Sequence, residues 1–254
     1  MTRHLRAGLM IAASRIFAQV AQFVVFLLAA ALMGPADFGI FALVSAWAYI
    51  MGALAGSGWA EYVMQWHEPG DAVPRRVLGM SAISGATMAL IVAILTLAMP
   101  LITRDPVVIP LMLLFAVTIL LGAVANTLAG VLNRQERLTT AALALIAAEL
   151  AGLVVSVGLL LAGYGVFALA WGRIVFTGTW MVTGFVTSRM SPDFRLQRDE
   201  VRPVLAYVSR IIVVRLLMNL RLYSATLVIG IFLGAAEAGW FRAGSASRAL
   251  WARS

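Results

Sequence analysis

The 254-residue sequence contains no cysteine and no lysine, and it has only two histidines. Without cysteine, the chain can form neither disulfides nor thiolate-ligated metal or iron–sulfur sites. His4 and His67 lie in a terminal tail and in a predicted loop, where we expect solvated side chains rather than ligands. We therefore expect no metal and no cofactor.

Motifs for nucleotide binding and catalysis are also absent. The chain has no GxxxxGK[ST] phosphate loop, no HExxH zinc motif and no GxSxG nucleophile elbow. It also leaves no room for a soluble domain of appreciable size between its apolar segments. Transport driven by ATP within this chain is therefore excluded, and we do not expect an enzyme.

Charged residues are scarce, at 12% of the sequence, whereas 62% of the residues are hydrophobic and the mean hydropathy is +0.96. In soluble domains about a quarter of all residues are charged and about half are apolar, so this composition indicates a membrane protein. The formal net charge is +8, and all 19 basic residues are arginine. They are spread between apolar segments and form no compact basic patch with interleaved aromatics, so no nucleic-acid partner is expected.

Long apolar runs recur along the chain. Seven are long enough to cross a membrane, for which about 20 residues are needed, and an eighth begins near Trp240. They are continuous and much longer than the strands of an outer-membrane barrel, so they predict an all-α polytopic membrane protein with about seven to eight transmembrane helices. The runs cover residues 9–33, 38–60, 78–102, 107–131, 139–162, 166–188 and 204–233.

Arginines between these runs predict how the chain is oriented. Ten of them fall in the N-terminal tail and in every second connection, whereas the opposite connections contain only Arg104. Because basic loops stay on the cytoplasmic side, we expect the N-terminus in the cytoplasm. The ten are Arg3, Arg6, Arg75, Arg76, Arg134, Arg137, Arg189, Arg195, Arg198 and Arg202.

The loop at residues 34–41 (GPADFGIF) is similar in sequence to residues 234–241 (GAAEAGWF), and each of these segments lies between two apolar runs. Arg15 and Arg215 match at the same offset. The repeat predicts two lobes of the same orientation, related by an axis along the membrane normal. We expect a six-helix lobe at residues 1–188, a cytoplasmic linker at 189–203 and the incomplete start of a second lobe at 204–254. A partial product is favoured over a half-transporter that pairs with another chain.

Polar residues inside the predicted helices indicate an internal cavity, because ionisable groups at bilayer depth are costly unless they face protein or water. In the first helix three of them share one face, at spacings i, i+4 and i+7. The repeat assigns two more, Arg215 and Asn219, to the positions of the seventh helix that are equivalent to Arg15 and Gln19. A cavity rich in arginine favours an anionic solute. The candidate substrate-binding residues are Arg15, Gln19, Gln22, Arg215, Asn219 and Arg221.

Glu149 is the only carboxylate well inside a predicted helix. Two interpretations stay open: an ion pair with an arginine such as Arg173, or a switch that couples transport to protons or sodium. Asn126 and Asn133 are interpreted as residues that bridge helices.

Several short motifs are similar to those of Wzx-type polysaccharide flippases, which belong to the multidrug/oligosaccharidyl-lipid/polysaccharide (MOP) superfamily. Residues 32–43 (LMGPADFGIFAL) resemble the first outer loop of that family, and residues 56–58, 133–137 and 163–172 fit as well. The resemblance implies a MOP-like fold, in which two six-helix lobes surround a cavity lined by the first, second, seventh and eighth helices. This chain departs from it in length, since twelve to fourteen helices are expected.

The resemblance also implies a function, namely transport of an undecaprenyl-pyrophosphate-linked oligosaccharide across the bacterial inner membrane by alternating access. The three candidate arginines would then hold the pyrophosphate, and the three candidate amides would contact phosphate or sugar hydroxyls. The implied partners are the lipid-linked oligosaccharide, membrane lipids, and a polymerase and other polysaccharide assembly proteins. Two alternatives remain: a multidrug antiporter of the same superfamily, which would need acidic cavity residues, and a non-transporting membrane component of a polysaccharide synthesis complex.

Overall fold

The computed structural model describes residues 2–68, 70–98, 105–195 and 198–232, and the regular structure in these ranges is α-helical. The eighth predicted span and the second copy of the repeated loop lie outside them. The helices are α1 (Thr2–Leu32), α2 (Pro35–Gly56), α3 (Trp59–Gln65), α4 (Ala72–Leu97), α5 (Val108–Arg134), α6 (Leu138–Leu161), α7 (Val166–Ser188) and α8 (Arg198–Phe232).

Six of the described helical segments are long and apolar enough to cross a membrane, so the chain is a multi-pass membrane protein. They correspond to the six spans predicted before residue 189. The second span is interrupted between α2 and α3, because Gly58 adopts a left-handed conformation with φ of 90°. Residues 204–232 of the seventh predicted span lie within α8. Residues 198–203, predicted as part of the linker, are already helical there, with Pro203 inside the helix.

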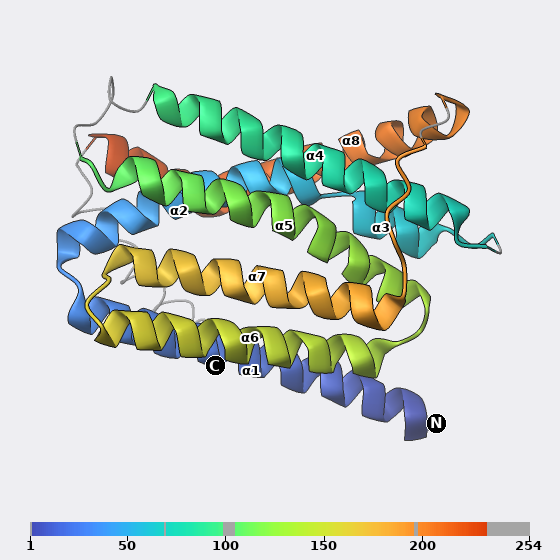
Figure 1. The fold of residues 1–254 in the computed structure, drawn as a ribbon, viewed down its shortest axis with the longest axis horizontal. Helices are drawn as coiled ribbons and strands as arrows, with labels where there is room; N and C mark the ends of the chain where they lie inside the picture. The colour runs from blue at the N-terminus through green and yellow to red at the C-terminus, as the bar shows by residue number, and fades with distance from the viewer. Residues whose placement is uncertain (1, 69, 99–104, 196–197, 233–254) are drawn as a thin grey trace.

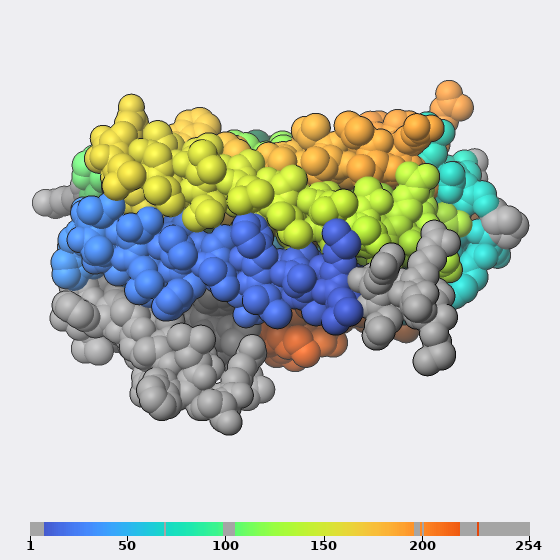
Figure 2. Space-filling model, turned by 90° about the horizontal axis from the view of Figure 1, so that it is seen from below, coloured from blue at the N-terminus to red at the C-terminus, as the bar shows by residue number. Residues whose placement is uncertain are grey.

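The helices lie side by side along the long axis of the molecule, and most of them pack against helices that are distant in sequence (Figure 1). Helix α1 packs on α6, α6 on α7, α7 on α5, and α5 on both α4 and α2. Helix α8 packs on α2 and α3. Figure 2 shows α1 along one face of the molecule, beside α6.

Glycines let several of these helix pairs approach closely. A Cβ atom on Gly130 of α5 would lie 2.7 Å from the backbone of Ala60 in α3, and one on Gly85 of α4 would lie 2.9 Å from Cβ of Ala123 in α5. On Gly152 of α6 it would lie 2.9 Å from Cβ of Phe176 in α7. Small residues at such interfaces allow transmembrane helices to associate by van der Waals contact.

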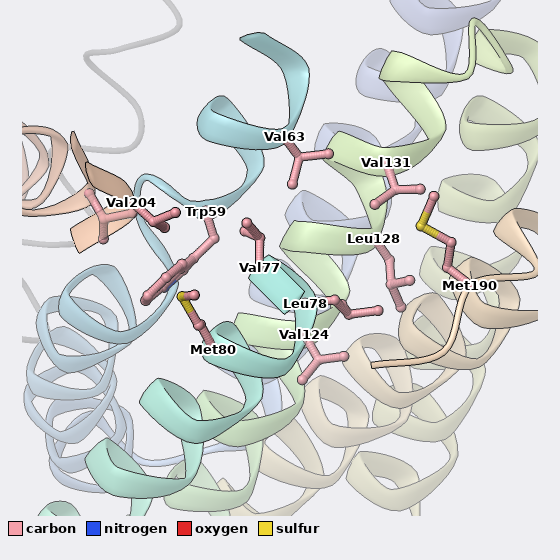
Figure 3. Packing of buried hydrophobic residues seen from close by; sticks show 11 residues of the cluster. Trp59, Val63, Val77, Leu78, Met80, Val124, Leu128, Val131, Met190 and Val204 are labelled. Carbon is pink, nitrogen blue, oxygen red and sulfur yellow. The ribbon is translucent and has the colours of Figure 1, made fainter. Parts of the chain in front are cut away.

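A cluster of buried apolar side chains joins α3, α4, α5 and α8 (Figure 3). Trp59 of α3 is 3% exposed, and its indole Nε1 donates a hydrogen bond to the carbonyl of Ala55 at 2.9 Å. Met190, which follows α7, and Val204 of α8 belong to the same cluster. The connection after α7 and the beginning of α8 are therefore packed into the same core as α3, α4 and α5.

The connections rich in arginine lie at one end of the molecule, together with the N-terminus (Figure 1). Arg134 holds the connection between α3 and α4, because its guanidinium donates to the carbonyls of Trp66, Glu68 and Gly70 and to the carboxylate of Asp71. In the connection after α7, Asp193 forms a salt bridge with Arg76 of α4, and Ser191 accepts hydrogen bonds from Arg75. These arginines stabilise the loops at that end.

Candidate functional site

The described helices surround a cavity of about 700 Å³. Its walls come from α1, α2, α3, α5, α6, α7 and α8. It extends from Phe115 toward Asn133, near the end of α5 at which the arginine-rich connections lie. The cavity is therefore formed where the helices of the predicted first lobe meet α8.

Three arginines from three different helices line this cavity: Arg15 of α1, Arg173 of α7 and Arg215 of α8. Among the described residues that line it, Glu61 of α3 is the only acidic one. Oε1 of Glu61 accepts a hydrogen bond from Nη2 of Arg215 at 3.0 Å, and Oε2 accepts one from the backbone N–H of Gly58 at 3.0 Å. Three positive charges thus face one negative charge.

A smaller cavity of about 160 Å³ adjoins the first, and its lining is mostly apolar and aromatic. Glu149 of α6 lies in it, is 6% exposed and accepts a hydrogen bond from Nε2 of Gln22 in α1 at 3.0 Å. Both cavities share one group of lining residues, which therefore lies between them: Tyr49, Phe115, Arg173 and Phe176.

The structure brings some of the predicted site residues together. Arg15 and Arg215, at equivalent positions of the repeat, line the same large cavity. Gln22 lines the smaller one, whereas Gln19 is exposed and lines neither. The side chains of two further candidates lie outside the described residues: Asn219 and Arg221.

Glu149 and Arg173 line the smaller cavity together. In the part of the chain that the structure describes, Glu149 is hydrogen-bonded to Gln22 rather than joined to Arg173 in a salt bridge. The guanidinium of Arg173 instead lies over two aromatic rings, at 5.6 Å from the ring centre of Tyr49 and 4.8 Å from that of Phe176.

Sequence reasoning overlooked several residues of the cavity wall. Asn126 and Asn133, interpreted as helix bridges, both line the cavity, and Nδ2 of Asn133 also contacts Sδ of Met64 at 3.7 Å. Glu61 received no role, although its spacing from Gly58 fits the capping of a helix start. Tyr49 likewise received none, although a tyrosine well inside an apolar run is a signal that a polar group is required there.

A sequence model of the family described as Polysaccharide biosynthesis protein matches residues 27–251. The chain belongs to this family. The match takes in the last six residues of α1 and the whole of α2 to α8. No curated protein shows a significant match.

Among solved structures, a MOP superfamily transporter from Pyrococcus furiosus resembles this family member in fold, with a TM-score of 0.61 and 16% sequence identity. Its binding pocket is described as having reversed polarity. The similarity covers 91% of this chain and 57% of that one, so the chain spans little more than half of the length of that transporter. The MOP-like fold and the polysaccharide family that the loop motifs implied are both confirmed.

Proposed function

We propose that this chain forms the first lobe, and the start of the second, of a transporter that moves a lipid-linked oligosaccharide across the bacterial inner membrane. The substrate would be anionic, with its charge on an undecaprenyl-linked pyrophosphate, and transport would proceed by alternating access. The observation that carries the proposal is the cavity of about 700 Å³ lined by Arg15, Arg173 and Arg215. Membership of the polysaccharide biosynthesis family supports it.

The charge of the cavity favours an anionic solute over a cationic one. Charges at the low-dielectric wall of a protein cavity interact more strongly than charges in bulk water, and here three guanidinium groups outnumber the carboxylate of Glu61. A pyrophosphate offers several oxygens to which guanidinium groups bind in a bidentate manner. A cationic drug would meet net repulsion, so the charge balance argues against the multidrug antiporter.

The position of the cavity fits loading from the cytoplasm. It reaches Asn133 and Leu138, beside a connection that contains Arg134 and Arg137. The excess of arginine at this end predicts that it faces the cytoplasm, where lipid-linked oligosaccharides would enter. The amide of Asn126 and the hydroxyl of Thr118, both in the wall, are suited to hydrogen bonds with sugar hydroxyls.

The proposal is tested in a strain that lacks the gene and accumulates lipid-linked oligosaccharide on the inner leaflet. We expect the wild-type gene to restore export, and Arg15→Ala or Arg215→Ala to abolish it while the protein still inserts at normal levels. Arg210→Ala is the matched control, because this exposed arginine of α8 is not among the cavity residues. Full export by both cavity variants would contradict the proposal.

The same assay tests the non-transporting alternative. A membrane component of a synthesis complex would be needed for assembly of the oligosaccharide, so its loss would lower the amount of lipid-linked product. A transporter is needed only after assembly, so its loss raises that amount on the inner leaflet. The leaflet distribution, measured with a membrane-impermeant lectin or glycosidase, therefore separates the two.

A further inference from the structure

Arg173 occupies the boundary between the two cavities. It lies within α7, is partly buried and lines both the large cavity and the small one. Its guanidinium carbon is 4.8 Å from the ring centre of Phe176, in the same helix, and 5.6 Å from that of Tyr49, in α2. Aromatic rings from two helices thus hold the guanidinium at the junction.

The hydrogen-bonding groups of this guanidinium are not used by the lobe itself. Within the described residues, its guanidinium contacts the two rings, and the side-chain hydrogen bond at this residue is one that its backbone carbonyl accepts from the hydroxyl of Thr177. Arg215 differs, because Glu61 accepts a hydrogen bond from it. Glu149, the carboxylate that lines the small cavity together with Arg173, accepts its hydrogen bond from Gln22.

A guanidinium near an aromatic ring is held by electrostatic attraction to the ring, and this attraction needs no oxygen acceptor for its N–H groups. An arginine held in this way therefore keeps donors for a bidentate contact with phosphate. Because Arg173 lines the large cavity, an anion in that cavity can reach these donors.

We infer that Arg173 is a phosphate-binding residue of the large cavity, and that Tyr49 and Phe176 are positioning residues that hold its guanidinium. This inference rests on the proposed function and deepens it: the phosphate of the substrate is bound at the inner limit of the large cavity, where Arg173 lies. It replaces the ion-pair role for Arg173 that the sequence alone left open. Glu149 then balances the charge of Arg173 across the small cavity without occupying its donors.

The test is a binding measurement on the purified chain in nanodiscs of phosphatidylcholine, a zwitterionic lipid. The probe is farnesyl pyrophosphate, with farnesol and inorganic pyrophosphate in parallel. We expect Arg173→Gln to weaken binding of farnesyl pyrophosphate by about 10- to 100-fold, the range for lost hydrogen bonds to a charged group, and to leave farnesol unchanged. Arg210→Gln, which removes the same charge outside the cavity, should bind as the wild type does.

Two further variants separate direct contact from a structural role. Arg173→Lys keeps the charge but not the fork of donors, so binding should be weakened less than in Arg173→Gln. Glu149→Gln removes the carboxylate and should leave the affinity unchanged or raise it. If Arg173 served only as the ion-pair partner of Glu149, the Glu149→Gln and Arg173→Gln variants would lose the same affinity and thermal stability, and this outcome would overturn the inference.

The positioning role is tested at Tyr49, where Tyr49→Phe keeps the ring and Tyr49→Leu removes it. We expect Tyr49→Phe to retain the affinity for farnesyl pyrophosphate and Tyr49→Leu to lose a large part of it. Equal losses in both variants would contradict stacking as the means of positioning.

The outcomes distinguish this inference from the proposed function. If the wild type binds no pyrophosphate probe, the proposed function fails. If Arg15→Gln weakens binding and Arg173→Gln does not, the inference fails alone. If inorganic pyrophosphate binds as tightly as the farnesyl compound and depends equally on Arg173, the anion site is supported and the lipid-linked substrate is contradicted.

Discussion

The three arginines of the large cavity have the same charge but different surroundings. Arg15 is exposed on α1, Arg173 lies over two aromatic rings, and Arg215 donates a hydrogen bond to Glu61 at 3.0 Å. An arginine with a carboxylate partner carries less uncompensated charge than one stacked on rings. The three positions should therefore contribute unequally to binding of an anion.

Glu61→Gln should strengthen anion binding. The substitution removes the single negative charge among the described lining residues and leaves Arg215 with a neutral neighbour. We expect the affinity for farnesyl pyrophosphate to rise by about three- to tenfold at low salt and less at high salt, because charge interactions are screened. Glu68→Gln is the matched control, since Glu68 is exposed in the connection before α4. Weaker binding in Glu61→Gln, with an unchanged unfolding temperature, would contradict the charge argument.

Depth and helical face identified two of the three arginines that line the large cavity, and their role in substrate binding stays a prediction. Arg15 and Arg215 face the same cavity, as their positions in the repeat implied. The stacking of Arg173 could not be predicted, because it depends on contact between α2 and α7. Gln19 shares a face with Arg15 but lines neither cavity, since packing of α1 on α6 selects only part of that face.

At the level of the helices, Gly58 forms the junction of α2, α3 and α8. Its φ of 90° ends the straight path of α2, and a Cβ atom at this position would lie 2.9 Å from Cα of Val208 in α8. Two independent requirements, a left-handed backbone and close contact with α8, therefore favour glycine at this position.

Gly58→Ala should separate α8 from α3. Gly163→Ala is the matched control, because Gly163 also has a positive φ, of 85°, but has open space around its Cβ position. The measurement is cross-linking of Tyr62→Cys to Tyr207→Cys with a short bis-maleimide, because the rings at these positions are 5.5 Å apart and the chain has no cysteine of its own. We expect efficient cross-linking in the wild-type background, little in Gly58→Ala and a normal level in Gly163→Ala. Unchanged cross-linking in Gly58→Ala would show that the junction tolerates a side chain.

Hydropathy identified the membrane-spanning helices but not their breaks. Seven spans were predicted because each run has about 20 apolar residues, which the bilayer requires, and the first six of them are found among the described helices. Hydropathy did not predict the break at Gly58, because Gly56, Ser57 and Gly58 barely change the mean hydropathy of the run. The break is seen only in the backbone angle of Gly58. Hydropathy also did not predict that α8 begins at Arg198, because a charged helix outside the hydrocarbon has the same hydropathy as a loop.

At the level of the whole molecule, the loops divide into an arginine-rich end and an arginine-poor end (Figure 1). Single cysteines at the two ends should therefore react from opposite sides of the membrane. We expect a membrane-impermeant maleimide to label Tyr164→Cys in intact spheroplasts and Glu136→Cys only after permeabilisation. Both positions are exposed, and the sequence contributes no background thiol. The reverse pattern would contradict the predicted orientation and, with it, the proposal that a substrate enters the cavity from the cytoplasm.

The glycine contacts between helices have a consequence for how movement is transmitted. At Gly130, Gly85 and Gly152 the neighbouring helices meet at distances that leave no room even for a methyl group. Surfaces packed so closely cannot slide past one another without opening voids, which is costly. Helices α3, α4 and α5, and likewise helices α6 and α7, should therefore each move as one rigid group. A displacement of one helix at the arginine-rich end would then also displace the other helices of its group at the opposite end of the molecule.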